Sequence, residues 1–229
     1  MNSIIIDKPG KYQDADKKNL ENSITFSNCL KLFGILLTMV FFASGCGLRR
    51  DYVVLSYDPQ RMVEKLKRAD LVKVEVEILD ARTIRDKVGY MKNDWGVRIG
   101  PIIARNDVAD LLKKAIEGEL KNRGFELAPG SATVLAELNK YYYHFEDAGT
   151  WTIGGTGVAD IVMNIQVKKP NKSILYSKLI TEDFKYMFLR LTTGKDAKIA
   201  LDRALEYAMR ELFGDAAFID SISKACLIE

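Results

Sequence analysis

The fold is decided first by residues 71–79, which read LVKVEVEIL. Valine or isoleucine occupies every second position from Val72 to Ile78, and lysine or glutamate occupies the positions between them. Such alternation is typical of a β-strand with one buried face and one face in water. Asp80 and Arg82 follow, two residues apart and therefore on one side of the chain. We expect them to form an ion pair that fixes the turn after the strand.

Two helices are predicted further along the chain. Residues 107–123 place their apolar side chains on one stripe, and the first of them, or the asparagine before it, can cap the start. Gly124 stands where a helix commonly ends in a left-handed residue. The second helix is expected to begin at Thr193, with Asp196 three residues on as in a capping box, and to end at Gly214.

The segments between the helices read as strands that are half buried. Residues 83–103 are expected to form a long excursion or loose hairpin. After the first helix, the pattern predicts a short strand at residues 125–128 and three long strands at 132–145, 157–167 and 174–189. Pro170-Asn171-Lys172 is expected to turn one long strand into the next. Alternation with one polar face fits a sheet covered on one side by helices. We therefore predict an α+β fold, a two-layer sandwich with a mostly antiparallel sheet and two main helices on one face.

A membrane signal precedes this domain. Lys31 is followed by an apolar stretch over residues 32–43, and residues 41–47 read FFASGCG. A basic residue, a short apolar core and small residues before a cysteine form the pattern of a bacterial lipoprotein signal. The apolar core has twelve residues, which fits a signal peptide of roughly 7 to 15 and is short of the about 20 that span a bilayer. We expect cleavage before Cys46 and a diacylglycerol on its thiol.

The domain organisation follows from that cleavage. Residues 1–45 are predicted to be a removed signal peptide, residues 46–70 a lipidated N-terminus and tether, and residues 71–229 a single α+β periplasmic domain. More than one acyl chain on Cys46 would give stable anchoring. The residue after the cysteine is Gly47 rather than the aspartate that usually marks retention in the inner membrane. We therefore expect the periplasmic face of the outer membrane.

Composition argues against several kinds of partner and cofactor. The mature chain would carry 29 basic and 27 acidic residues without a block of one sign, so nucleic acid is not expected as a partner. Cys226 would be its only free thiol, which leaves no intrachain disulfide and no cysteine metal site. His144 is the sole histidine. We expect no metal and no cofactor.

The catalytic candidates are weak. Residues 154–157 are GGTG, but a phosphate-binding loop needs a helix after it, and here a strand follows. His144 has the chemistry of a general base, yet the sequence places no nucleophile beside it. The adjacent pairs Glu146-Asp147 and Glu182-Asp183 point to opposite faces of their strands. No enzyme is predicted, and an envelope hydrolase is the least favoured reading.

Aromatic residues form the better candidate for a site. Three tyrosines in a row cannot all face the core of a strand, so at least one ring must be outward or lie under a loop. Two tryptophans fall in predicted loops. Exposed aromatic side chains favour protein interfaces. The candidate partner surface comprises Trp95, Trp151, Tyr141, Tyr142 and Tyr143.

Together these features resemble the YajG family of small bacterial lipoproteins. The resemblance is carried by the strand 72–76 with Asp80-Ala81-Arg82, the helix 107–123 closing in Asn122-Arg123-Gly124-Phe125, the strand 157–161 and the last alanine-rich helix. It covers roughly residues 71–214 and the lipoprotein signal. It implies a lipid-anchored envelope protein of unknown biochemical role, with no catalytic residues to carry over. The order of elements is also similar to that of the lipopolysaccharide-assembly and curli-secretion lipoproteins, which is a likeness of fold alone.

The function expected from the sequence is that of a non-enzymatic interaction module, held at the membrane by Cys46. Its partner would be an envelope protein or an envelope polymer, contacted through the loops at residues 83–103 and 149–157. An alternative is a self-assembling subunit of a secretion or assembly complex, which would form a homo-oligomer through sheet edges or the aromatic strand.

Overall fold

The computed structural model describes residues 50–60, 65–66, 69–93, 97–130, 132–146, 155–188 and 193–225. Contacts divide the chain into two compact units, residues 1–47 and 48–229, and every described residue belongs to the second. The predictions for Cys46, Trp95, Trp151 and Cys226 lie outside the described residues, as does most of the glycine-rich loop. They remain predictions.

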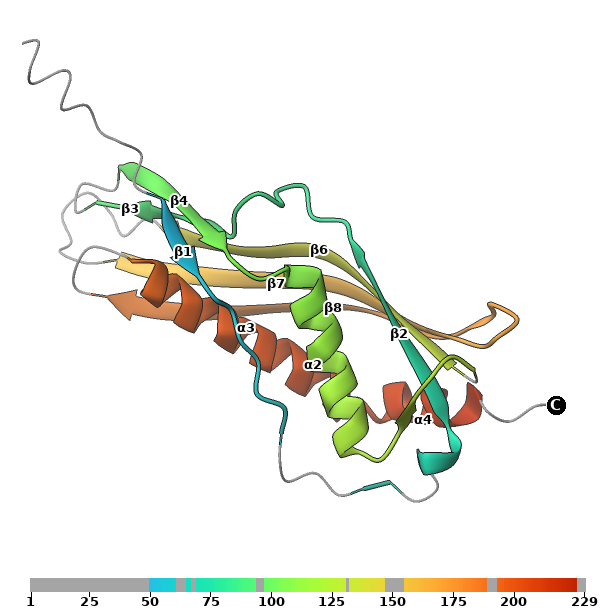
Figure 1. Cartoon of the computed structure of the whole chain (residues 1–229). Coiled ribbons are helices and arrows are strands. Elements are labelled where there is room, and N and C mark those ends of the chain that lie inside the picture. Colours follow the sequence, from blue (N-terminus) through green and yellow to red (C-terminus); the bar gives the residue numbers. More distant parts are fainter. Residues whose placement is uncertain are drawn as a thin grey trace, which may run out of the picture. The chain divides into compact units, whose positions relative to one another are not determined.

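Within the described residues, eight strands and three α-helices build the domain (Figure 1). The strands are β1 (Asp51–Val53), β2 (Lys73–Asp80), β3 (Gly89–Lys92), β4 (Arg98–Ala104), β5 (Glu126–Leu127), β6 (Ala132–Glu146), β7 (Gly155–Lys168) and β8 (Ile174–Phe188). The helices are α2 (Val108–Asn122), α3 (Gly194–Gly214) and α4 (Ala216–Ala225), and a 3-10 turn, η1 (Ala69–Leu71), precedes β2. The α+β class predicted from the sequence is confirmed.

All eight strands belong to one mixed sheet. The long strands β6, β7 and β8 pair antiparallel in sequence order, and β3 pairs antiparallel with β4. Both β2 and β3 lie along the other side of β6 and run parallel to it, because the hairpin and α2 return the chain before β6 begins. The longest strands therefore pair antiparallel, as predicted. The parallel pairing of β2 with β6 differs from the mostly antiparallel sheet predicted from the sequence.

The helices lie on one face of this sheet (Figure 1). Helix α2 packs on β2, α3 packs on β6, β7 and β8, and α4 packs on β7 and β8. The core fills the space between the two layers with small and branched residues, which let the layers approach closely. Its fully buried members include Ile102, Ile116, Leu138, Tyr143, Ile161, Met163 and Leu201.

Local signals at the helix ends act as the sequence predicts. The Asp107 carboxylate accepts a 2.9 Å hydrogen bond from the Asp110 N–H at the start of α2. Gly124 follows that helix at φ +97°, in the left-handed region. At the start of α3, the Asp196 carboxylate accepts from the Thr193 N–H at 2.9 Å and from its hydroxyl at 2.8 Å. The predicted capping box is confirmed.

The end of β2 also follows the prediction. The Asp80 carboxylate accepts hydrogen bonds from both Nε and Nη2 of Arg82, at 2.9 and 2.8 Å. Only 6% of the Arg82 side chain is exposed, so this fork-shaped pair is largely withdrawn from water. It holds the first residues after β2 in place.

The folded domain begins earlier than the predicted boundary at residue 71. Residues 51–53 form β1 beside β4, and residues 55–60, here called the strap, run across α2 and α3. The strap is fixed by the Leu55 N–H on Asn106 at 2.9 Å and the Ser56 N–H on Asp202 at 3.0 Å. Within the predicted lipidated N-terminus and tether of residues 46–70, residues 51–60 are therefore part of the folded domain. The bonds to distant residues that fix them leave no periodic signal in the sequence.

A buried ion pair joins the strap to the helices. One Glu119 oxygen accepts from the Tyr57 hydroxyl at 2.6 Å and from the Gln60 N–H at 2.8 Å, and the other lies 2.5 Å from Nη1 of Arg123. Glu119 and Arg123 are 1% and 7% exposed, and the Arg123 guanidinium stacks over Phe213 of α3. Burial and the neighbouring carboxylate raise the pKa of Tyr57.

Candidate functional site

The three consecutive tyrosines are divided between the two faces of the sheet. Tyr141 and Tyr143 point into the core, with 2% and 0% of their surface exposed, whereas Tyr142 points to the face without helices, here called the open face. The predicted partner surface is therefore wrong for Tyr141 and Tyr143. Tyr142 is its one described member that lies on an accessible face.

A β-bulge decides which tyrosines face inward. The pairing of β6 with β7 shifts between Leu138 and Lys140, so that Asn139 is the extra residue. Before the bulge the even-numbered residues of β6 are buried, and after it Tyr141 and Tyr143 are. Because a shift of one residue exchanges the faces of a strand, the bulge is what places Tyr142 on the open face.

Tyr142 lies beside a second tyrosine and several cations. Tyr90 of β3 is held between Lys87 and Arg98, whose charged groups lie 5.3 and 5.2 Å from its ring centre. Partial burial and the neighbouring Tyr90 raise the pKa of Tyr142, while Lys87 and Arg98 oppose that rise. The result is an aromatic and basic patch, the Tyr142 patch, made of Lys87, Tyr90, Arg98 and Tyr142.

Charged residues continue the open face beside this patch. Asp160 of β7, the register partner of Tyr142, lies 2.5 Å from the Lys140 ammonium and 3.2 Å from Nδ1 of His144. Lys185 and Glu146 form another pair at 2.6 Å. His144 thus contacts the Asp160 carboxylate, as in a surface ion pair. That arrangement orients an imidazole but supplies no nucleophile.

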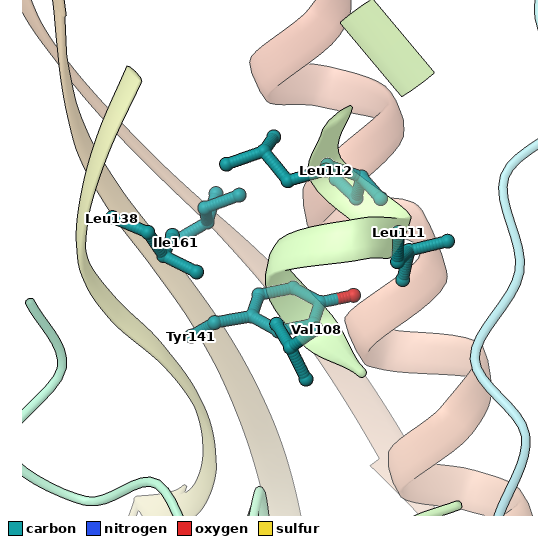
Figure 2. Close-up of a pocket in the computed structure, with 7 residues that line it drawn as sticks. Val108, Leu111, Leu112, Leu138, Tyr141 and Ile161 are labelled. Atoms are coloured by element: carbon teal, nitrogen blue, oxygen red, sulfur yellow. The ribbon is translucent and has the colours of Figure 1, made fainter. Parts of the chain in front are cut away.

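The cavity beneath α2 is too small to hold a ligand. It measures about 10 Å³ and lies between α2, the sheet and α3 (Figure 2). Figure 2 shows the Tyr141 hydroxyl pointing toward Val108 and Leu111 of α2, and this hydroxyl has no hydrogen-bond partner within the described part of the chain. Its burial raises the pKa of Tyr141 far above the usual value. A water would find one polar partner there, fewer than the two to four that hold buried water.

A wider hollow lies where β8 meets α3. It encloses about 230 Å³ and is lined by Glu182, Tyr207, Arg210 and Glu211. Burial and the nearby Glu211 and Asp183 carboxylates raise the pKa of Glu182. The hollow is open and of mixed charge, so it resembles a surface depression more than a substrate pocket.

Neither a metal centre nor a membrane span is found in the described part. Across the described ranges no three His, Cys, Asp or Glu side chains are grouped so as to hold a metal ion. Of the helices within those ranges, none is long and apolar enough to cross a bilayer.

Sequence reasoning missed three members of the Tyr142 patch. Tyr90, Lys87 and Arg98 lie in the excursion that the sequence predicts only as a loose hairpin, and they reach Tyr142 through the parallel pairing of β3 with β6. No local pattern reveals that pairing. The same pairing brings the ends of β3 and β6 together, and the chain leaves them toward the segments that contain Trp95 and Trp151.

The chain belongs to the family described as uncharacterized lipoprotein, whose model matches residues 59–223. The match covers the strap from Pro59 onward, the whole sheet except β1, and all three helices up to Ser223. No curated protein matches the sequence. A lipoprotein family is thus confirmed, and the description of that family assigns it no biochemical activity.

Several solved structures share parts of this fold. A protein from Xanthomonas campestris is 13% identical, with a TM-score of 0.47, and the match covers 72% of this chain and 93% of that one. A minor lipoprotein from Acinetobacter baumannii is 10% identical, with a TM-score of 0.37 and coverages of 61% and 88%. A hypothetical protein from Chlamydia trachomatis is 8% identical, with a TM-score of 0.38 and coverages of 68% and 98%. At these scores no property of those proteins is carried to this chain.

Proposed function

We propose that this chain is a YajG-type lipoprotein of the bacterial envelope, anchored through acyl chains on Cys46 to the periplasmic face of the outer membrane. The match of residues 59–223 to a lipoprotein family carries this proposal. The signal pattern that ends in Cys46 supports it independently, because it lies outside the matched range. Gly47 after the cysteine supports the outer membrane over the inner one.

Intact mass measured on the full-length chain, extracted from its own membranes in mild detergent, tests the anchor. We expect a mature protein that begins at Cys46 and carries acyl chains, and we expect the Cys46→Ser variant to lack them. A chain that keeps residues 1–45 and carries no lipid would contradict the proposal.

The domain acts, in this proposal, as a non-enzymatic interaction module that binds an envelope protein or polymer through its open face. The Tyr142 patch supports this role, because aromatic side chains flanked by cations are typical of interface anchors. Tyr142 and Tyr90 offer flat rings, and the Arg98 guanidinium lies 5.2 Å from the centre of the Tyr90 ring. The adjoining loops with Trp95 and Trp151 would extend the contact.

Crosslinking in cells tests this surface. A photoreactive phenylalanine analogue replaces Tyr142 in one variant and Tyr207 in a matched control. Tyr207 is also a half-buried tyrosine beside an arginine, but it lies on α3. We expect a defined adduct from position 142 and none from position 207. Equal adducts from both positions, or none from position 142, would contradict the open face as the site.

The loop contribution is tested by Trp151→Ala in the same cells. We expect the variant to fold as the parent does and to lose part of the adduct formed at position 142. A variant that keeps its partner at full strength would exclude Trp151 from the contact.

The second candidate function is a self-assembling subunit, and the edge strand β8 favours it. This strand has 15 residues and, among the described strands, pairs with β7 alone, whereas the opposite edge is formed by the three residues of β1 and the two of β5. A long unpaired edge is a template for another strand. Native mass spectrometry of the extracted protein distinguishes the candidates: a homogeneous homo-oligomer supports assembly, and a monomer with a co-purifying species supports the interaction module.

A further inference from the structure

The pairing of the strands places one end of the sheet next to the point where the chain enters the domain. Strand β1 is parallel to β4, β4 is antiparallel to β3, and β3 is parallel to β6, which is antiparallel to β7. Strands β4 and β7 therefore begin at the same end of the sheet, where β3, β6 and β8 finish (Figure 1). Strand β1 runs in the direction of β4 and begins level with Ile102, four residues inward from Arg98. This end is here called the proximal end.

The entry point itself is fixed on the domain. Asp51, the first residue of β1, is the register partner of Ile102. Its carboxylate accepts a 2.7 Å hydrogen bond from the N–H of Gly194, the first residue of α3. A Cβ on Gly194 would lie 2.8 Å from that carboxylate, so the contact is close as well as polar. The chain is therefore held by both layers where it enters the domain.

A short length of chain separates this point from the proposed lipid. Cys46 precedes Asp51 by five residues, which span at most about 18 Å when fully extended. The 14 residues of β7, by comparison, extend for about 46 Å. If Cys46 carries acyl chains in the bilayer, Asp51 stays within about 18 Å of that residue, and the proximal end is the end of the sheet nearer to Asp51.

The surface of the proximal end matches that environment. Two large apolar side chains are exposed there: Val97 by 58% and Met187 by 81%. The basic residues Arg50, Arg98 and Lys195 are exposed at the same end. Among the described acids near this end, Asp51 is bonded to Gly194 and Glu146 to Lys185. Apolar and cationic side chains together suit a bilayer interface that contains anionic lipid.

We infer that the proximal end is a lipid-binding surface, with Val97 and Met187 in the headgroup layer and the basic side chains on lipid phosphates. This inference rests on the proposed acylation of Cys46. It adds that the domain lies against the membrane by its own surface and is not held away from it. The open face of the sheet then stands steeply to the bilayer, with its Tyr142 patch close to the headgroups.

Depth-dependent fluorescence quenching tests the inference on acylated full-length protein in vesicles of phosphatidylethanolamine and phosphatidylglycerol. In a Cys226→Ser background, Met187→Cys is labelled with an environment-sensitive dye, and spin-labelled lipids act as quenchers. The matched control is Ile174→Cys, because Ile174 is 55% exposed on the same strand and lies about 43 Å away at the distal end. We expect several-fold stronger quenching at position 187.

A lengthened tether separates surface affinity from mere proximity. Twenty Gly and Ser residues inserted after Gly47 would allow the domain to leave the membrane. We expect the label at position 187 to stay quenched in this variant, and to lose its quenching when Arg50 and Arg98 are also changed to Glu.

The outcomes distinguish the lipid-binding surface from the acylation of Cys46 on which it rests. Acylated protein with equal quenching at positions 187 and 174, or with quenching that disappears on lengthening the tether alone, overturns the lipid-binding surface and leaves the anchor intact. Protein whose mass shows no acyl group on Cys46 overturns both.

Discussion

The two faces of the sheet differ in composition although they are built from the same strands. On the covered face, the inward residues of β6 and β7 are almost entirely buried, as Tyr143, Ile161 and Met163 show. One position away on the open face stand Tyr142 and Asp160, which keep part of their surface in water. The comparison teaches that residue type does not assign a side chain to a face here, because neighbouring tyrosines have opposite roles and a backbone bulge decides between them.

Deletion of Asn139 would break the distinction between the faces and is expected to have the largest effect. Without the extra residue, the part of β6 that follows would turn over, so that Tyr142 and His144 face the helices and Tyr143 faces water. We expect loss of the cooperative folded state, measured by circular dichroism and urea unfolding. Asn139→Ala, which keeps the bulge, is the control and should change the unfolding free energy by less than about 1 kcal/mol. A deletion variant that folds as the parent does would contradict the role given to the bulge.

Alanine substitutions at adjacent tyrosines compare the faces directly. Tyr143→Ala removes a ring that packs against Phe145 and lies over Gly157, and should lower the unfolding free energy by about 3–5 kcal/mol. Tyr142→Ala should lower it by about 1 kcal/mol or less. Tyr143→Phe should be close to neutral, because the buried hydroxyl has no partner within the described residues. Urea unfolding of the three variants checks the order, and equal losses at both positions would contradict it.

Removing an ion pair should lower the unfolding free energy more on the covered side of the sheet than on the open face. Glu119→Gln would leave the Arg123 guanidinium buried without its carboxylate, with an expected loss of about 3 kcal/mol. Asp160→Asn, on the open face, should cost between about 0 and 1 kcal/mol, since Lys140 remains half exposed. Thermal and urea unfolding measure both variants. A larger loss for Asp160→Asn would reverse the comparison.

The last expected effect concerns the pH dependence of the Asp80–Arg82 pair. The hydrogen bonds from Arg82 hold the pKa of the Asp80 carboxyl below its usual value. Since the folded-state pKa is below that of the unfolded chain, the pair stabilises the fold above the unfolded pKa, and this contribution is lost as pH falls through the folded pKa. At pH 7, Asp80→Asn should lose about 1–2 kcal/mol. The difference from the parent should shrink steadily in acid, and a constant difference in urea unfolding across the range would contradict this account.

Local features of the fold were accessible from the sequence, and long-range ones were not. The helix caps at Asp107 and Thr193 and the Asp80–Arg82 pair involve residues two or three apart. The residue types at these short spacings are therefore enough to predict them. The strap is held by Asn106 and Asp202, which lie 51 and 146 residues away from their partners. The parallel pairing of β2 with β6 depends likewise on the path of the intervening chain.

The candidate surface was predictable to a similar degree. Three tyrosines in one strand indicate that at least one ring faces outward, and Tyr142 does. Which of the three it is depends on the bulge, and β-bulges leave a weak signal in an alternating strand. Tyr90 and Arg98 come to Tyr142 from another part of the chain. Their membership therefore requires the pairing of β3 with β6.

The attachment of β1 has a mechanical consequence. A pull on the N-terminal side of the domain enters at Asp51 and runs along β1, in line with the strand. The three-residue ladder with β4 then resists in shear, since its hydrogen bonds bear the force together and not one after another. Behind it, the bonds of Leu55, Ser56 and Tyr57 to three different segments spread the remaining tension over both helices. In a domain tethered at its N-terminal side, the β1–β4 ladder and the strap would therefore bear a pulling force before it reached the long strands β6, β7 and β8.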